Sequence, residues 1–140
     1  MTDNATTIAT AVEKLNAGDV VGYATSLYSP DAVFHGFPAA FPPTRAGIID
    51  FFSALVAAVP DACISARDLL SDGDRVALRF ALTGTHTGDL FGNAATGRAI
   101  EAEGITIVRF EGDQVAERWN RLDDLSFLTQ LGALPVAASA

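Results

Sequence analysis

Few side chains in this sequence could carry out acid/base, metal or nucleophilic chemistry. It has two histidines, His35 and His86, and one cysteine, Cys63. A single cysteine excludes an intramolecular disulfide and a cysteine-based zinc site, and the histidines show neither HxH nor HxxxH spacing. The glycines between residues 88 and 97 form no GxGxxG pattern, so no phosphate-binding loop is predicted. These residues therefore predict no metal site, and the histidines and carboxylates are the candidates for acid/base chemistry.

The two histidines lie in different settings. His35 directly follows Phe34, and strand alternation places it opposite Phe34, on the face of Phe37. If that face lines a cavity, His35 can act as a hydrogen-bond donor or a second acid/base; otherwise it is a hydrogen-bonded core residue. His86 stands between two threonines and two glycines. That setting favours a turn histidine bonded to the backbone, with a donor at a pocket mouth as the alternative.

A periodicity of 3.6 residues predicts four helices that would position these groups. One is expected over Thr6–Ala17, and a second follows the cap residue Asp19. A third begins after the cap residue Thr44 and ends at Pro60. A short last helix ends at Gly132.

Elsewhere the periodicity changes to two, which indicates strands. Strands after residue 62 should pair sequentially, because the connections between them are short. The order α-α-β-α-β-β-β-β-α predicts an α+β fold in which a curved antiparallel sheet, bulged at Gly84, wraps around helices as an open cone. The expected strands are Ala32–Phe37, Ala62–Leu70, Arg75–Leu82, Arg98–Phe110 and Gln114–Leu122.

Composition narrows the class of protein. The 140 residues are 49% hydrophobic and 19% charged, with a net charge of −8. One globular domain is expected, with a core over about residues 5–132 and a frayed tail over 133–140. The negative charge disfavours nucleic acid and anionic membranes as partners. No apolar stretch is long enough to span a membrane and the N-terminus lacks signal-peptide features, so a cytoplasmic protein is expected.

Several motifs occur in an order typical of one family. They are PDAVFH at 30–35, GDRVALR at 73–79, GTHTG at 84–88, ATGR at 95–98, and WNRLD at 119–123 followed by QLG at 130–132. As a set, over about Asp19 to Gly132, the sequence resembles the SnoaL-like polyketide cyclases (ester cyclases) of the nuclear-transport-factor-2-like superfamily.

The resemblance implies a fold and a chemistry. The fold would be the superfamily's α+β cone, also described as cystatin-like, which commonly forms homodimers through the outer sheet face. The characterised cyclases close a ring by intramolecular aldol condensation without metal or cofactor. Carried over by position, Asp123 matches the acid/base aspartate, His35 the polar residue of the first strand, and Arg109 the residue of a neighbouring strand. His35 replaces an amide side chain, and Arg109 replaces an imidazole.

Asp123 has two interpretations. Burial in an apolar cone would strengthen its carboxylate as a base. Alternatively it caps the last helix, unless Asp124 does so and leaves Asp123 free. Asp123 also shares strand parity with Trp119 and Glu117, so turning it inward requires a twist or bulge.

We expect a hydrophobic pocket for a carbonyl compound. Its walls and rim would include Trp119, His86, Phe37, Phe52 and Phe91. Arg109 is a further candidate, although strand arginines usually face solvent, where it could pair with Glu101 or Glu103.

The predicted function is cofactor-independent cyclase or isomerase-type acid/base catalysis on a hydrophobic small molecule. Epoxide hydrolysis or dehydration on the same cone is the first alternative, and an epoxide hydrolase would require Asp123, Arg109 and Glu101 to converge in the cavity. A non-catalytic small-molecule-binding module is the second alternative.

Overall fold

Four helices and five strands make up the part of the chain described by the computed structural model, residues 3–133. The predicted α+β class is confirmed. Apart from Ala133, the tail expected from residue 133 onward lies outside the described residues. In chain order the elements are α1 (Asn4–Asn16), α2 (Val20–Leu27), β1 (Tyr28–His35), α3 (Arg45–Ala58), β2 (Cys63–Asp72), β3 (Arg75–Thr85), β4 (Ala99–Glu111), β5 (Gln114–Leu122) and α4 (Asp124–Gln130).

Side-chain caps fix the start of the first three helices. Asp3, Asp19 and Thr44 each accept a hydrogen bond from the backbone N–H three residues later, at 2.7, 2.9 and 3.1 Å. The caps at Asp19 and Thr44 confirm the two predicted boundaries. The end of α3 before Pro60 also agrees with prediction.

The sheet has the order β1-β5-β4-β3-β2. Strands β2 to β5 pair sequentially and antiparallel, as predicted. The expectation of a wholly antiparallel sheet is wrong for β1, which pairs in parallel with β5 so that His35 lies opposite Trp119. A parallel pair requires a long crossover connection, and here all the elements between β1 and β5 form it. The first and last strands of the chain are therefore neighbours in the sheet.

Two strand details differ from the sequence-based expectation. Strand β1 begins at Tyr28 rather than Ala32. Strand β3 continues in register with β4 through Gly84, so the bulge predicted there is absent. A register shift occurs instead in β2, between Ala66 and Asp68, where one extra residue bends the edge strand, and further shifts occur where β5 pairs with β1 and β4.

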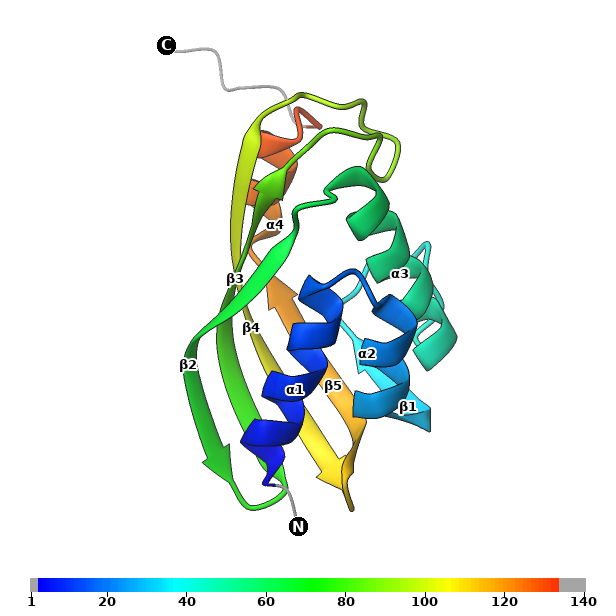
Figure 1. The fold of residues 1–140 in the computed structure, drawn as a ribbon, viewed down its shortest axis with the longest axis vertical. Coiled ribbons are helices and arrows are strands. Elements are labelled where there is room, and N and C mark those ends of the chain that lie inside the picture. Colours follow the sequence, from blue (N-terminus) through cyan, green and yellow to red (C-terminus); the bar gives the residue numbers. More distant parts are fainter. Residues whose placement is uncertain (1–2, 134–140) are drawn as a thin grey trace.

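The curvature of the sheet creates an inside and an outside. Figure 1 shows α1, α2 and α3 on one side of the sheet and α4 at its upper end. The core fills the space between, and Ile48 of α3, Val76 of β3 and Val115 of β5 have no exposed surface. Alternate residues of β4 are buried along the whole strand, as expected for a sheet with one solvated face.

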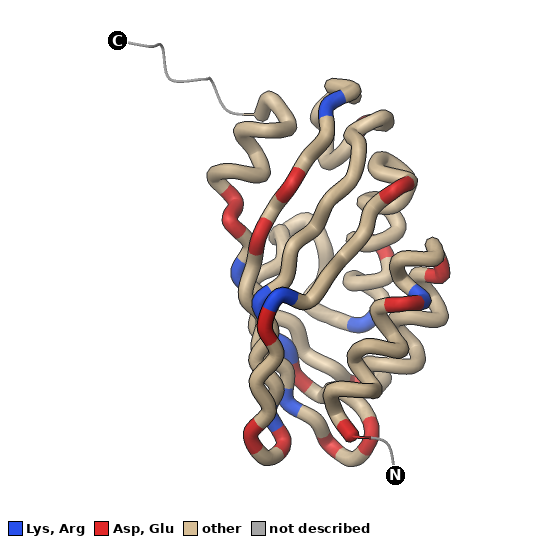
Figure 2. The backbone as a smooth tube through the Cα atoms, turned by 60° about the vertical axis from the view of Figure 1, so that its left-hand side comes forward, with Lys and Arg blue, Asp and Glu red and all other residues tan. Residues whose placement is uncertain are grey.

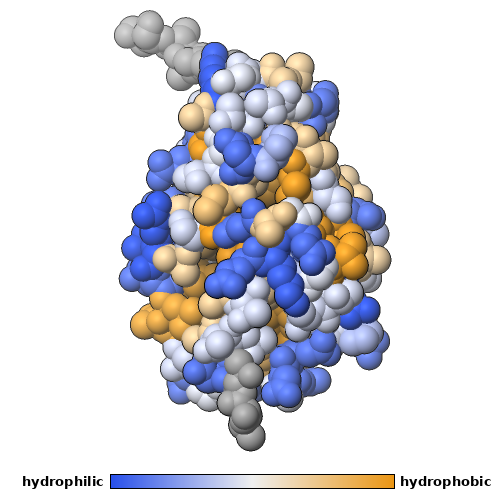
Figure 3. All heavy atoms as spheres, in the orientation of Figure 1, coloured by the Kyte–Doolittle hydropathy of each residue, from blue (hydrophilic) through white to orange (hydrophobic). Residues whose placement is uncertain are grey.

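The surface carries scattered charge. Acidic residues occur on helices, strands and turns rather than on one face (Figure 2). On the face seen in Figure 3, hydrophobic residues lie between hydrophilic ones. No helix among residues 3–133 is both long enough and apolar enough to cross a membrane.

Candidate active site

An apolar cavity of about 70 Å³ lies between the helices and the concave face of the sheet. Phe37 and Phe52, both expected pocket residues, line it. Its aliphatic walls come from α1, α2, α3 and four strands, and Phe127 of α4 closes one side. The other apolar lining residues are Ile8, Val12, Leu15, Leu27, Phe51, Leu55, Ile64, Leu78, Phe80, Leu82, Val108 and Leu122.

Five hydrogen-bonded side chains interrupt this apolar wall; we call them the polar floor: Tyr23, Tyr28, Thr106, Arg118 and Asn120. Arg118 stands at its centre and is 9% exposed. Its Nη1 donates to both tyrosine hydroxyls, its Nε to Thr106 Oγ1, and its Nη2 to Asn120 Oδ1. The floor therefore joins α2 and β1 to the middle of β4 and β5.

Strand alternation explains why these residues face inward. On β5, residues 118, 120 and 122 line the cavity, whereas Glu117, Trp119 and Arg121 have the opposite parity. Tyr23 and Tyr28 are fully packed, with ring centroids 5.6 Å apart in an edge-on arrangement. Burial raises the pKa of Tyr23 well above its ordinary value, and the neighbouring Tyr28 adds to this. Tyr23 therefore stays a neutral phenol over the physiological range.

A wider cleft of about 580 Å³ adjoins the cavity. The two share the walls Phe37, Phe51, Asn120, Leu122 and Phe127. The remaining cleft residues are Gly36, Pro38, Ala40, Phe41, Phe91, Asn93, Asp124 and Leu128. The Pro-rich segment after β1, the loop between β3 and β4, and α4 together form this cleft.

Phe91 forms the rim of the cleft. It stacks on Phe51 at 5.4 Å between ring centroids and meets Phe41 edge-on at 5.7 Å. Among residues 3–133, it is the one non-glycine residue with positive φ, at 50°. A strained backbone of this kind persists only where its surroundings hold it, so the aromatic contacts fix the loop over the cleft.

His86 is buried at the base of the same loop. The backbone N–H of Thr96 donates to His86 Nδ1 at 3.3 Å, and Gly97 N–H donates to the His86 carbonyl at 2.8 Å. Because Nδ1 accepts, the proton sits on Nε2, which has no partner among the described residues. His86 lines neither the cavity nor the cleft, so its expected place at the pocket mouth is wrong; it anchors the loop instead.

Asp123 is the N-cap of α4. Its Oδ1 accepts from Ser126 N–H at 3.1 Å, and its side chain is exposed. The prediction that this carboxylate lies inside the apolar cone is therefore wrong, because its strand parity turns it away from Leu122 and the cavity. The next residue, Asp124, lines the cleft. The possibility that Asp124 caps the helix and leaves Asp123 free is therefore reversed: Asp123 is the cap and Asp124 faces the cleft.

His35 and Trp119 lie on the outer face of the sheet. Their rings stack with centroids 5.5 Å apart, and the guanidinium of Arg75 lies 5.2 Å from the Trp119 ring centroid. The expected place of both in the pocket is wrong. Phe34 faces the core and His35 faces out; Phe37 turns inward only after Gly36, which has φ +89°.

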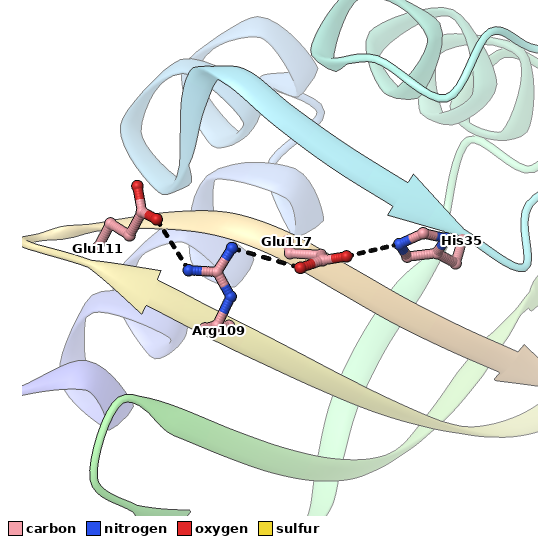
Figure 4. Close-up of polar contacts among 4 residues, drawn as sticks. All are labelled: His35, Arg109, Glu111 and Glu117. Carbon is pink, nitrogen blue, oxygen red and sulfur yellow. Dashed lines mark hydrogen bonds and ion pairs between the residues drawn. The ribbon is translucent and has the colours of Figure 1, made fainter.

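Arg109 belongs to an ion-pair chain on the same outer face (Figure 4). Glu117 accepts from His35 Nε2 at 2.8 Å and from Arg109 Nη2 at 3.3 Å, and Arg109 Nη1 reaches Glu111 at 2.9 Å. The solvated ion-pair alternative for Arg109 is the one observed, with Glu111 and Glu117 as partners. Asp123, Arg109 and Glu101 share no cavity, so the arrangement required for epoxide hydrolysis is absent among residues 3–133.

The ion pairs around Glu117 predict how the stability of the protein depends on acid pH. The hydrogen bond from His35, reinforced by Arg109, holds the pKa of Glu117 below its ordinary value. A carboxyl group with a depressed folded-state pKa stabilises the fold above its ordinary pKa and loses that effect as pH falls through the folded-state value. We expect Glu117→Gln to be less stable at neutral pH and to lose less stability on acidification.

Urea unfolding from about pH 7 to about pH 3 measures this difference. Glu111→Gln is the matched control, because Glu111 pairs with the same arginine but its side chain is 70% exposed. Identical acid profiles for the two variants would contradict the assigned role of Glu117.

Sequence reasoning missed the polar floor. An arginine in a strand is usually exposed to solvent, so the residue type of Arg118 does not indicate that it lines a cavity. The available signal was parity: placing Trp119 and Glu117 outside puts Arg118 and Asn120 inside.

The fold and motifs match a known family. The family model described as SnoaL-like polyketide cyclase matches residues 6–131. The chain belongs to the SnoaL-like polyketide cyclase family. A comparison with curated proteins finds no match.

Several solved structures resemble this chain along most of its length. AclR from Streptomyces galilaeus, provisionally described as a hydroxylase, is 26% identical with a TM-score of 0.82, covering 94% of this chain and 97% of its own. IdmH from Streptomyces antibioticus, provisionally described as a polyketide cyclase, is 31% identical with a TM-score of 0.79, covering 94% and 99%. TsrD from Streptomyces laurentii is 25% identical with a TM-score of 0.80, covering 96% and 100%.

Proposed function

We propose that this SnoaL-like protein is a cofactor-independent cyclase-like enzyme that acts on a hydrophobic carbonyl compound by acid/base catalysis. The observation that carries the proposal is an apolar cavity with a hydrogen-bonding floor built around Arg118. An enclosed apolar wall with few convergent polar groups is the usual form of a small-molecule site. Family membership and the resemblance to IdmH support a cyclase-like role.

The two spaces suit different parts of one ligand. The inner cavity of about 70 Å³ takes a small end group, such as one carbonyl, against the polar floor. The cleft of about 580 Å³ takes the larger body, between Phe41, Phe91 and Leu128. Their shared walls keep the two parts in contact. A bound ligand would thus point its oxygen toward Arg118 and its carbon skeleton toward α4.

The proposed acid/base group is Asp124. Of the carboxylates among residues 3–133, it is the one that lines the cavity or the cleft. A guest packed against Phe127 and Leu128 would exclude water from this carboxylate and strengthen it as a base. Asp123, the residue that the family resemblance favours, is occupied as the N-cap.

In the proposed step, Asp124 takes a proton from a carbon flanked by two carbonyl groups. The resulting enolate is stabilised at its oxygen by donors of the polar floor. Its carbon forms a bond to the carbon of a third carbonyl group, farther along the same molecule, whose oxygen becomes an alkoxide. The proton on Asp124 returns to that alkoxide, so the reaction is an isomerisation with no net change in atoms.

The adjacent aspartates provide a matched test. With polyketide-like 1,3-dicarbonyl compounds as substrates, we expect Asp124→Asn to lose about 10²-fold or more in turnover. Turnover is measured by chromatography of the product, which has the same mass as the substrate. Asp123→Asn should keep its activity, because asparagine caps a helix as well as aspartate does. Loss of turnover in Asp123→Asn alone would return the catalytic role to Asp123. Binding without turnover in the wild type would favour the non-catalytic module.

We also propose that two copies pair through the outer sheet face. Val33, Ile105 and Ile107 are exposed there at 44%, 55% and 39%. The half-buried Trp119 lies opposite Ile107 on the same face, and the charged chain of Figure 4 runs beside these apolar residues. Apolar centres with polar rims are typical of protein interfaces.

Ile105→Glu is expected to convert this dimer to a monomer, because it places two like charges near a self-complementary interface. Sedimentation velocity gives the mass of each species. Leu125→Glu on α4, at a residue 70% exposed, is the matched control and should leave the oligomer intact. A wild-type monomer at high concentration would refute the pairing.

A further inference from the structure

Arg118 carries a buried positive charge whose partners are all neutral. Its four hydrogen bonds go to Tyr28 at 2.6 Å, Thr106 at 3.0 Å, and Tyr23 and Asn120, each at 3.1 Å. A guanidinium has five N–H groups, so one on Nη2 is left over among these contacts. The group is held rigidly, with one donor still available.

A counter-ion for this charge is absent from the described residues. No carboxylate oxygen among residues 3–133 lies within 4.0 Å of the Arg118 nitrogens. Tyr23 remains a neutral phenol, since its burial opposes ionisation. The net charge of the chain is −8, yet its acidic residues are distributed over the outer elements (Figure 2). The cavity thus contains an uncompensated cation in an acidic protein.

Such a charge is costly to bury unless something compensates it. The hydrogen bonds that link the surrounding elements supply no counter-ion, because none of their acceptors is a carboxylate. Arg118 instead lines the cavity, and its guanidinium lies 5.1 Å from the ring centroid of Phe37, which lines both cavity and cleft. The cation is therefore placed where a ligand entering from the cleft would meet it.

We propose that the cavity binds its ligand as an organic oxyanion, the conjugate base of an acidic enol or phenol, with Arg118 as the counter-ion. This rests on the proposed function and deepens it, because it names the substrate class. After transfer of its proton to Asp124, a 1,3-dicarbonyl compound would be held as its enolate, with the charged oxygen on the free Nη2 N–H and the neutral remainder in the apolar walls. Simple ketones and ethers, which cannot ionise, would bind weakly.

Two probes of nearly equal shape test the charge preference. 4-Nitrophenol ionises to a yellow phenolate, whereas 4-nitroanisole is its neutral methyl ether. In the wild-type chain we expect 4-nitrophenol to bind about tenfold more tightly, measured by calorimetry. The phenolate absorbance band should also appear at lower pH in the complex than in free solution, because the cation favours the charged form.

Three variants assign that preference to Arg118. Arg118→Met should bind both probes equally and lose the shifted absorbance, while Arg118→Lys should keep part of it. Arg67→Met removes the same charge from the exposed bulge of β2 and should behave as the wild type. Far-UV circular dichroism shows whether each variant is folded, and the wild-type comparison of the two probes stands without any variant.

The possible failures are distinguishable. Equal affinity of the wild type for both probes would overturn the oxyanion proposal and leave a hydrophobic cavity site intact. A phenolate preference that survives in folded Arg118→Met would overturn the role of Arg118. No binding of either probe would overturn the oxyanion proposal together with the cavity site on which the proposed function rests.

Discussion

Phe52→Ala is expected to lower the free energy of unfolding by about 3–5 kcal/mol. Phe52 is 3% exposed and lies at the centre of the aromatic cluster. Its ring meets Tyr23 at 5.3 Å, Phe51 at 5.0 Å and Phe37 at 6.3 Å between centroids, all edge-on. Truncation removes these contacts and leaves space that the rigid surroundings fill only in part.

The same change should enlarge the binding site, since Phe52 lines the inner cavity. An apolar void of this kind takes up small aromatic molecules. We expect Phe52→Ala to bind benzene or toluene more tightly than the wild type does, measured by calorimetry beside urea unfolding. Phe91→Ala at the cleft rim, where the residue is 37% exposed, is the control and should lose less stability than Phe52→Ala. Equal losses in the two variants would contradict the assigned packing.

Gly36→Ala is expected to destabilise the fold by more than about 4 kcal/mol. Gly36 has φ +89°, and a Cβ atom there would clash with the backbone oxygen of Asn120. Neither backbone can yield without separating β1 from β5. Asn120 accepts from Arg118 and Thr106, so the displacement would also disturb the polar floor.

Gly112→Ala separates the two causes of this loss, which are the positive φ and the clash of the added Cβ atom. Gly112 has φ +63° and no atom within 4 Å of its built Cβ, so alanine there meets only the backbone penalty of about 1–2 kcal/mol. Thermal and urea unfolding of both variants measure the difference. If Gly36→Ala is no less stable than Gly112→Ala, the close approach of β1 and β5 is wrong.

Local signals predicted most of the architecture. Caps at Asp19 and Thr44 and the proline at residue 60 fixed helix boundaries, since their effect is confined to one helix turn. Alternation located β3, β4 and β5 to within a few residues. The parallel pairing of β1 was not predicted, because its partner lies at the far end of the chain and leaves no local pattern.

The site was harder to predict than the fold. Asp123 was assigned through family resemblance, although its parity with Trp119 already opposed an inward side chain. Phe37, Phe52 and Phe91 line the cavity or cleft, as their apolar character suggested; contact with a substrate stays a prediction. Arg118 was overlooked because a buried arginine is recognisable only once its partners Tyr23 and Tyr28 are placed.

The distance along the chain between these partners affects how the protein matures. Arg118 meets Tyr28 across 90 residues and Tyr23 across 95. Closing such a long loop is entropically unfavourable and slow compared with forming local hairpins. During synthesis, the N-terminal helices emerge long before β5 exists to receive them. The newborn polypeptide therefore completes its binding chamber only after β5 has been synthesised.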